Sequence, residues 1–111
     1  MKLLTQQEEL VLLAIWNLKD NAYLVTVREY LSKATGKEWS IGAVYMPLDR
    51  VEKMGYAESN LGDPTHERGG RRKKFYRITK DGFAVLGEMK EVNERLWNTF
   101  PDSVIDEGKT V

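Results

Sequence analysis

The fold is decided by residues 39–79, which read WSIGAVYMPLDRVEKMGYAESNLGDPTHERGGRRKKFYRIT. Ser40 is a favourable N-cap residue and Gly55 is typical of the position just after a helix, so we predict a helix between them. Residues 56–61 and 73–79 have the composition of two strands, and the loop between them is rich in glycine and basic residues. A helix followed directly by a hairpin is the order of the recognition helix and wing in a winged helix-turn-helix.

Pro47 lies inside this predicted helix and conflicts with it. A proline at such a position costs roughly 3 kcal/mol and removes the backbone hydrogen bond to the carbonyl of Ala43. Two outcomes stay open at this point: the helix kinks at Pro47, or its regular part begins later than Ser40.

The same helix has one apolar side and one mixed side at 100° per residue. The expected core side consists of Val44, Leu48 and Val51, and the opposite side of Gly42, Met46, Asp49 and Lys53, with Tyr45 at its edge. Gly42 would allow the backbone to approach DNA closely. Tyr45 can donate a hydrogen bond to a phosphate or pack on a thymine methyl, and a half-buried structural aromatic is an equally good interpretation. We expect Asp49 to pair with Lys53, four residues further on.

The chain carries no net charge, because 17 Lys and Arg balance 17 Asp and Glu, but its charges are unevenly distributed. Residues 66–80 contain seven basic residues and one acid, which gives this segment a net charge of +6. A basic hairpin suits phosphate contact because Lys and Arg displace condensed counterions, although a solvated hairpin is the plainer interpretation. The residues expected to contact DNA are Ser40, Gly42, Tyr45, Met46 and Lys53 on the helix and Arg68, Gly69, Gly70, Arg71, Arg72, Lys73 and Lys74 on the wing.

Two further helices are predicted before this segment. Thr5 begins a capping-box pattern, T-x-x-E, and with it a helix over residues 6–18. Thr26 begins the same pattern and predicts a short helix over residues 27–34.

The last predicted helix begins at Thr79, covers residues 80–99 and is closed by Pro101. Its apolar side chains form two strips, which together are broader than one small domain can cover. We expect one strip to pack on the domain itself and the other on a second copy of the chain; the alternative is that the whole helix folds back on its own domain. The residues assigned to the dimer contact are Val85, Met89, Val92, Leu96, Trp97 and Phe100. Trp16, Met89 and Trp97 are predicted to line a cavity between subunits that binds a flat hydrophobic effector, although such aromatics are more often core.

The composition excludes several classes of protein. The chain has no cysteine and one histidine, His66. Disulfides, thiol catalysis and cysteine zinc sites are therefore excluded, and with a single histidine we expect neither a histidine metal cluster nor a Ser-His-Asp triad. We expect no cofactor and no enzymatic activity. The N-terminus has no signal-peptide pattern and no apolar run reaches the roughly 18 residues that span a bilayer, so no membrane contact and a cytoplasmic location are expected.

Several segments are similar to PadR-family transcriptional regulators. The similarity covers roughly residues 5–100 and rests on ELVLLAI at 9–15, GAVY at 42–45, LDRVEKMGY at 48–56 and RGGRRKKFYRITKDG at 68–82. The resemblance implies a bacterial winged-helix dimer that binds operator DNA, usually as a repressor, and that is often released by a small aromatic or drug-like effector.

Single residues of this sequence match positions of the family's motifs. Tyr45 matches the family's helix-three tyrosine, and Gly69, Gly70, Arg71 and Tyr76 match its wing motif. Pro47 stands one residue later than the Tyr-Pro commonly seen in the family. The single C-terminal helix resembles the compact branch, of which some members bind planar compounds between tryptophans at the dimer centre, and Trp97 lies near that region.

The sequence thus predicts a mainly α fold with a small β-hairpin, organised as a winged helix-turn-helix over residues 1–79, a C-terminal dimerisation helix over 80–100 and a disordered tail over 101–111. We expect a homodimeric, sequence-specific DNA-binding transcriptional regulator, a repressor of operator DNA that a small hydrophobic or aromatic effector releases. The alternative is a winged-helix protein-interaction module that does not bind DNA.

Overall fold

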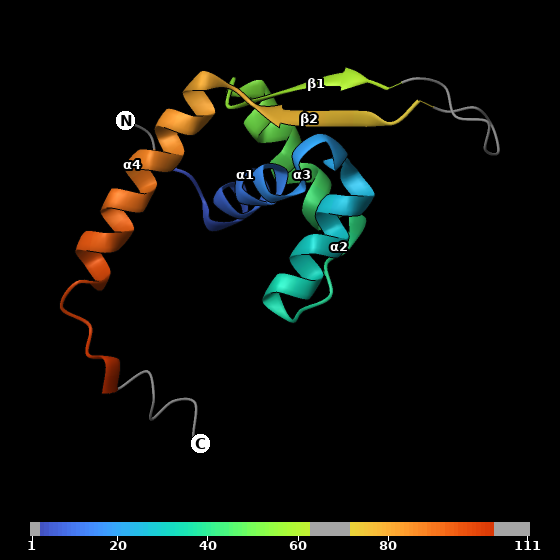
Figure 1. Ribbon diagram of the computed structural model, residues 1–111. Helices are drawn as coiled ribbons and strands as arrows, with labels where there is room; N and C mark the ends of the chain where they lie inside the picture. Colours follow the sequence, from blue (N-terminus) through green and yellow to red (C-terminus); the bar gives the residue numbers. More distant parts are fainter. Residues whose placement is uncertain (1–2, 63–71, 104–111) are drawn as a thin grey trace.

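The computed structural model describes residues 3–62 and 72–103 and is mainly helical, with one antiparallel hairpin (Figure 1). In chain order the elements are α1 (Gln6–Leu18), a short 3-10 turn η1 (Lys19–Asn21), α2 (Leu24–Thr35), α3 (Ile41–Lys53), β1 (Ala57–Leu61), β2 (Lys74–Ile78) and α4 (Lys80–Trp97). Helices α1, α2 and α3 pack around a common apolar core, and the hairpin covers one end of it. The predicted fold class of helices and a small hairpin is confirmed.

Three of the predicted helix starts are confirmed by their capping hydrogen bonds. At α1 the capping box is complete, because the Thr5 hydroxyl accepts from the Glu8 N–H at 3.2 Å and the Glu8 carboxylate accepts from the Thr5 N–H at 2.9 Å. The Ser40 hydroxyl accepts from the Ala43 N–H at 3.1 Å at the start of α3. The Thr79 hydroxyl begins α4 in the same way.

The predicted start of the second helix at Thr26 is wrong. The N-cap residue is Tyr23, and α2 begins at Leu24, three residues before the predicted first residue. Thr26 occupies the third helical position, where its hydroxyl accepts from the Tyr23 N–H at 2.9 Å and donates to the Asn21 carbonyl at 2.6 Å. The Thr26 side chain thus ties the helix to the preceding turn from inside the first turn of α2.

Pro47 does not delay the start of α3. The helix is continuous from Ile41 to Lys53 and contains Pro47, so the alternative that its regular part begins later than Ser40 is wrong. Pro47 is buried, on the same side as the fully buried Val44, Leu48 and Val51. The proline ring therefore contributes to the core in the place where the helix lacks one hydrogen bond.

The hairpin is attached to the helices at both of its strands. In the antiparallel register Ala57 lies opposite Ile78 and Leu61 opposite Lys74. Tyr76, in the middle of β2, is buried, and its N–H donates to the Ala22 carbonyl between η1 and α2 at 2.8 Å. This bond fixes the wing strand against the start of α2.

The buried side chains of helix α4 lie between Gly82 and Met89. Val85 and Met89 are 4% and 8% exposed within the single chain. These two residues were predicted to contact a second copy, but their side chains are used by the core of their own chain. Beyond them α4 leads away from the other helices (Figure 1), and Leu96 is 73% exposed. The tail predicted to be disordered lies outside the described residues from position 104 onward.

Candidate nucleic-acid interface

One side of α3 faces solvent and carries the side chains expected to read DNA. Tyr45 is 46% exposed and Met46 56% exposed, and Ile41 at the start of the helix is similarly open. Ser40 and Gly42 are also exposed, and a Cβ at Gly42 would meet nothing within 4 Å. Because Val44, Leu48 and Val51 point into the core, the predicted orientation of the helix is confirmed.

The charged side chains of α3 all lie in its C-terminal half, and each is held by a protein partner. Lys53 Nζ lies 2.9 Å from the Asp49 carboxylate, which confirms the predicted pair. Arg50 Nε lies 2.8 Å from the Glu8 carboxylate on α1. The fourth charged residue, Glu52, is paired with the wing.

This contact between Glu52 and Lys74 joins the recognition helix to β2. Lys74 Nζ donates to Glu52 Oε1 at 2.8 Å, and the Ser59 hydroxyl of β1 donates to the other carboxylate oxygen. The hydrogen bond from Lys74, followed by that from Ser59, lowers the pKa of Glu52, and the same bond to Glu52 raises the pKa of Lys74. Lys74 was predicted to contact phosphate; in the free chain its ammonium group is bound to α3 and holds the base of the wing beside that helix.

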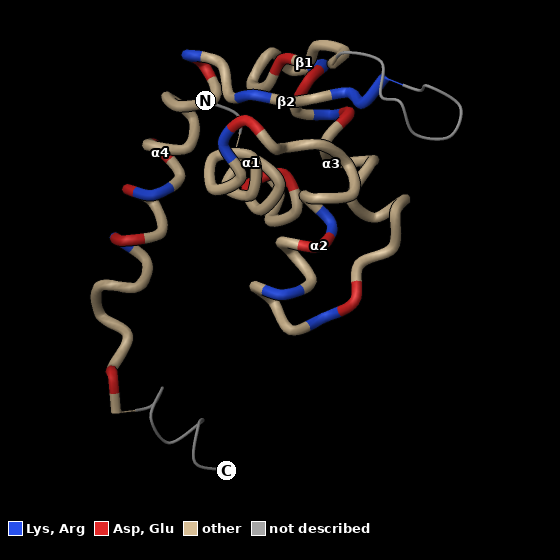
Figure 2. Tube along the Cα trace, turned by 45° about the vertical axis from the view of Figure 1, so that its right-hand side comes forward, with Lys and Arg blue, Asp and Glu red and all other residues tan. Residues whose placement is uncertain are grey.

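Lys73 and Arg72, which directly precede Lys74, do not contact α3 through this ion pair. Lys73 Nζ lies 3.3 Å from the Tyr23 hydroxyl and 4.6 Å from the centre of the Tyr23 ring, in a cation–π contact. The Tyr23 ring also packs edge-to-face on Phe75 at 5.4 Å. Figure 2 shows Lys and Arg along β2 up to the point where the grey trace begins, and Arg72 is exposed there. The predicted wing residues Arg68, Gly69, Gly70 and Arg71 lie outside the described residues.

Tyr23 is a residue of this region that sequence reasoning missed. It lies at the start of α2, 50 positions before Lys73, and no spacing pattern connects the two. The only local signal is an aromatic residue at an N-cap position, where small polar residues are preferred.

Tyr45, on the exposed face of α3, acts on groups of both α3 and β2. The pKa of Lys53 is raised first by its hydrogen bond to Asp49, and the nearby Tyr45 hydroxyl adds to the increase. Burial raises the pKa of Tyr76 on β2, and Tyr45 again adds a smaller contribution. Tyr45 on α3 therefore lies near Lys53 and near Tyr76 of β2.

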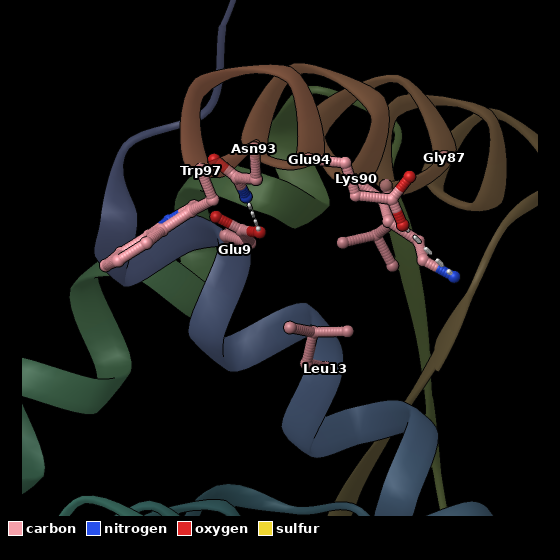
Figure 3. A pocket seen from close by; sticks show the side chains of 8 residues that line it. Glu9, Leu13, Gly87, Lys90, Asn93, Glu94 and Trp97 are labelled. Carbon is pink, nitrogen blue, oxygen red and sulfur yellow. Dashed lines mark hydrogen bonds and ion pairs between the residues drawn. The ribbon is translucent and has the colours of Figure 1, made fainter. Parts of the chain in front are cut away.

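A separate hollow of about 470 Å³ lies between α1 and α4 (Figure 3). Leu13, Leu86 and Trp97 give it an apolar lining, and Asn93 Nδ2 donates to the Glu9 carboxylate across it at 3.1 Å. Trp97 is 59% exposed and packs edge-to-face on Phe100.

The three residues predicted to bind an effector do not line one cavity of a single chain. Trp97 lines the hollow between α1 and α4, whereas Met89 is buried in the core. Trp16 lines a second hollow of about 210 Å³, where its ring packs on Phe83 at 5.7 Å and lies 3.4 Å from Lys19 Nζ.

Two kinds of site are not found in residues 3–62 and 72–103. No group of three His, Cys, Asp or Glu side chains there could hold a metal ion. Within the same ranges no helix is both long enough and apolar enough to cross a membrane.

Comparison with known proteins gives a family and a set of similar folds. Residues 12–88 match the Transcriptional regulator PadR-like family, and no curated protein sequence is significantly similar to the chain. RosR from H. salinarum has 19% sequence identity and a TM-score of 0.66, over 97% of this chain and 96% of that chain. A transcriptional regulator from Clostridium thermocellum has 23% identity and a TM-score of 0.64, over 85% of this chain and 88% of that chain. A PadR family transcription regulator from Clostridium difficile has 21% identity and a TM-score of 0.60, over 88% of this chain and 97% of that chain.

The structural similarities establish the fold, and the family match adds the type of protein. The matched residues extend from α1 through the hairpin into α4 and make up well over half of the chain. The family consists of transcriptional regulators rather than enzymes. The chain belongs to the PadR-like family of transcriptional regulators.

Proposed function

We propose that this protein is a sequence-specific regulator that places α3 in the major groove of operator DNA while the wing contacts the flanking phosphates. The observation that carries this proposal is the ion pair between Lys74 and Glu52, at 2.8 Å, which joins the base of the basic wing to the recognition helix. Tyr45 and Met46 are exposed on this helix, and Arg72 and Lys73 directly precede the strand to which it is joined, so base edges and backbone would be contacted by elements that are held together.

We further propose that the regulator acts as a homodimer through the second half of α4. Leu96, Trp97 and Phe100 are 73%, 59% and 44% exposed, and a second copy would remove this apolar surface from water. A two-fold dimer would present two recognition helices about 34 Å apart, one turn of DNA. In this arrangement residues 1–79 form the DNA-binding part and residues 80–100 the dimerisation helix.

Repression that is released by a flat hydrophobic effector fits the hollow between α1 and α4. Its volume of about 470 Å³ is within the range typical of small-molecule sites, roughly 300–1,000 Å³. Trp97 offers an aromatic surface for stacking, and Leu13 and Leu86 complete the apolar lining. Because the hollow adjoins the proposed dimer surface, a ligand there would change the spacing of the two recognition helices and so weaken operator binding. Binding of 1-anilinonaphthalene-8-sulfonate, followed by fluorescence, should fall with Trp97→Ala and remain with the control Trp16→Ala.

Salt-dependent DNA binding tests the central part of the proposal. Fluorescence anisotropy with duplex DNA should give a binding constant that falls linearly with salt on a double-logarithmic plot, with a slope of about −0.9 per neutralised phosphate. Arg72→Ala should reduce the slope by about 1 and weaken binding by a similar factor on all sequences. Arg95→Ala, on the exposed second half of α4, is the matched control and should leave the slope unchanged. No binding at about 50 mM salt would instead favour a protein-interaction module.

A further inference from the structure

The first half of the exposed α3 face is uncharged. Ile41, Tyr45 and Met46 are between 44% and 56% exposed there, and Gly42 adds no side chain between them. Helix α3 reads IGAVYMPLDRVEK and contains neither Asn nor Gln, and its first charged residue is Asp49. In helix-turn-helix proteins the N-terminal residues of the recognition helix reach the base edges.

The charged residues further along α3 are engaged within the protein. Arg50 is held by Glu8 at 2.8 Å, and Lys53 by Asp49 at 2.9 Å. Guanine is usually recognised by Arg or Lys, and adenine by a bidentate contact from Asn or Gln. The first half of α3 contains no Arg, Lys, Asn or Gln. The surface that would enter the groove therefore lacks the side chains that usually recognise bases by hydrogen bonds.

The thymine methyl is the one apolar group that base pairs present in the major groove. We propose that α3 recognises its operator through thymine methyl groups, which pack against Met46, Ile41 and the ring of Tyr45. The inference rests on the proposed DNA-binding function and adds the chemistry that the recognition helix reads. Each half-site is then expected to contain thymines at the positions that face the first two turns of α3.

The surroundings of this apolar face identify DNA as its occupant. Arg72 is exposed just before β2, and the next residue, Lys73, lies on the Tyr23 ring. Positive charge on a strand that the Lys74–Glu52 pair joins to α3 complements a polymer with phosphates on the outside and methyl groups in its groove. An apolar protein partner would leave these charges without a counterpart.

The experiment removes the methyl groups and leaves the hydrogen-bonding edges in place. The full chain is used to enrich duplexes from a random library, and the most enriched duplex is synthesised with thymine and with deoxyuridine, which lacks only the C5 methyl. Burial of one methyl corresponds to a change of about fourfold in affinity, so two contacted thymines should give a loss of about sixteenfold. Deoxyuridine at positions outside the two half-sites serves as the control and should change the affinity by less than twofold.

Variants of the protein assign the effect to α3. Met46→Ala should reduce the ratio between the affinities for the thymine and deoxyuridine duplexes, and its exposed position keeps the fold intact, as a thermal melt will show. Tyr45→Phe retains the ring and should retain the ratio even where the absolute affinity falls.

The possible results separate the inference from the proposed function. An enriched duplex whose affinity is unchanged by deoxyuridine, or an enriched sequence without thymines in its half-sites, overturns the inference alone. Enrichment of no sequence by the folded protein overturns the proposed function and the inference with it, and points to a protein partner for this face.

Discussion

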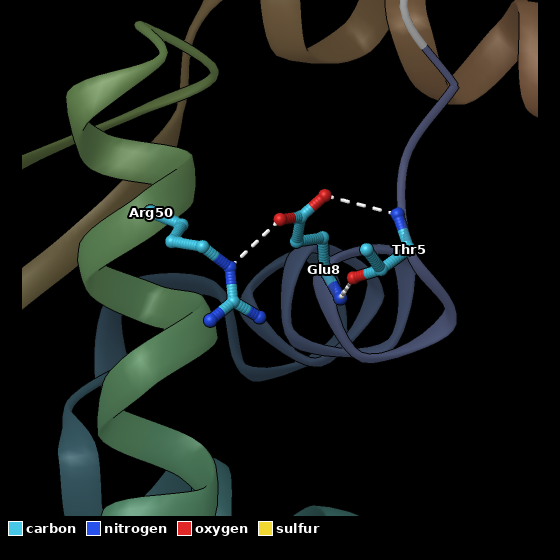
Figure 4. A network of polar contacts seen from close by, with 3 residues as sticks. All are labelled: Thr5, Glu8 and Arg50. Atoms are coloured by element: carbon cyan, nitrogen blue, oxygen red, sulfur yellow. Dashed lines mark hydrogen bonds and ion pairs between the residues drawn. The ribbon is translucent and has the colours of Figure 1, made fainter.

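Glu8→Gln tests how strongly the start of α1 is coupled to the recognition helix. The Glu8 residue is 6% exposed, and its carboxylate joins two elements (Figure 4). One oxygen accepts from the Thr5 N–H at 2.9 Å and the other from Arg50 Nε at 2.8 Å. Glutamine can keep the first bond through its carbonyl oxygen, but its amide nitrogen cannot accept from Arg50. The substitution therefore removes one charge-assisted hydrogen bond while the helix cap stays in place.

The expected loss follows from the exposure of the two partners. A hydrogen bond to a charged group contributes about 1.5–3 kcal/mol to the free energy of unfolding. Arg50 is 43% exposed, so water can solvate its guanidinium group in the variant and reduce the loss. We expect a destabilisation of about 1–2 kcal/mol at pH 7, with a fall in Tm of roughly 4–8 °C for each kcal/mol in a chain of this size.

The effect should also depend on pH. Burial raises the pKa of Glu8, but the hydrogen bonds from Thr5 and Arg50 together lower it by more than burial raises it. The pKa therefore lies below its ordinary value of 4.5. Because the carboxyl is more acidic in the folded chain than in the unfolded chain, its contribution to stability is complete above pH 4.5 and is lost as the pH falls below the folded pKa. The difference between wild type and Glu8→Gln should therefore shrink on acidification.

The assay is urea unfolding followed by circular dichroism at one protein concentration, at neutral pH and at about pH 3, with Arg50→Gln and the double variant completing a cycle. Glu94→Gln is the control, since its contact with Lys90 spans 3.9 Å at an exposed site and should contribute less than about 0.5 kcal/mol. A coupling energy below about 0.3 kcal/mol at neutral pH, or a difference that is undiminished at about pH 3, would refute the reasoning.

Four further substitutions test the packing of the wing and α4. Gly82→Ala should destabilise the fold by about 1–3 kcal/mol in thermal unfolding, because a Cβ there would lie 2.0 Å from the Tyr56 carbonyl oxygen. Gly87→Ala is the control: its Cβ meets nothing within 4 Å, so it should be neutral or stabilise the fold by up to about 1 kcal/mol. Leu96→Glu should give monomers in light scattering, and a persistent dimer would place the interface elsewhere. Glu52→Ala leaves no acceptor for Lys74 and Ser59, so it should release the wing from α3 and weaken DNA binding several-fold; unchanged affinity would contradict a positioning role for this pair.

The features that depend on local chemistry could be predicted from the sequence. Thr5, Ser40 and Thr79 cap their helices as expected, because an N-cap hydrogen bond connects residues three apart. The pair between Asp49 and Lys53 is likewise a contact within one helical turn. Thr26 shows the limit of such patterns, because a threonine hydroxyl can serve the first turn from the third helical position as well as from the N-cap.

The features that depend on distant parts of the chain could not be predicted. Lys74 belongs to a basic run, and only the folded chain shows that Glu52, 22 positions earlier, binds it. The apolar spacing of α4 is regular through Val85, Met89 and Leu96, but the position of the core decides that the first two are buried and the third is exposed. The separation of Trp16 from Trp97 also follows from tertiary packing alone.

Mapping by NMR tests most directly the claim that α3 and the wing form one DNA-binding surface. Backbone amide signals of the full chain are followed while the enriched duplex is added. The account predicts that the signals of Tyr45, Met46, Arg72 and Lys73 shift together at the same DNA concentration, and that those of Leu96 stay in place. Shifts that concentrate around Leu96 and leave α3 and β2 unchanged would contradict it.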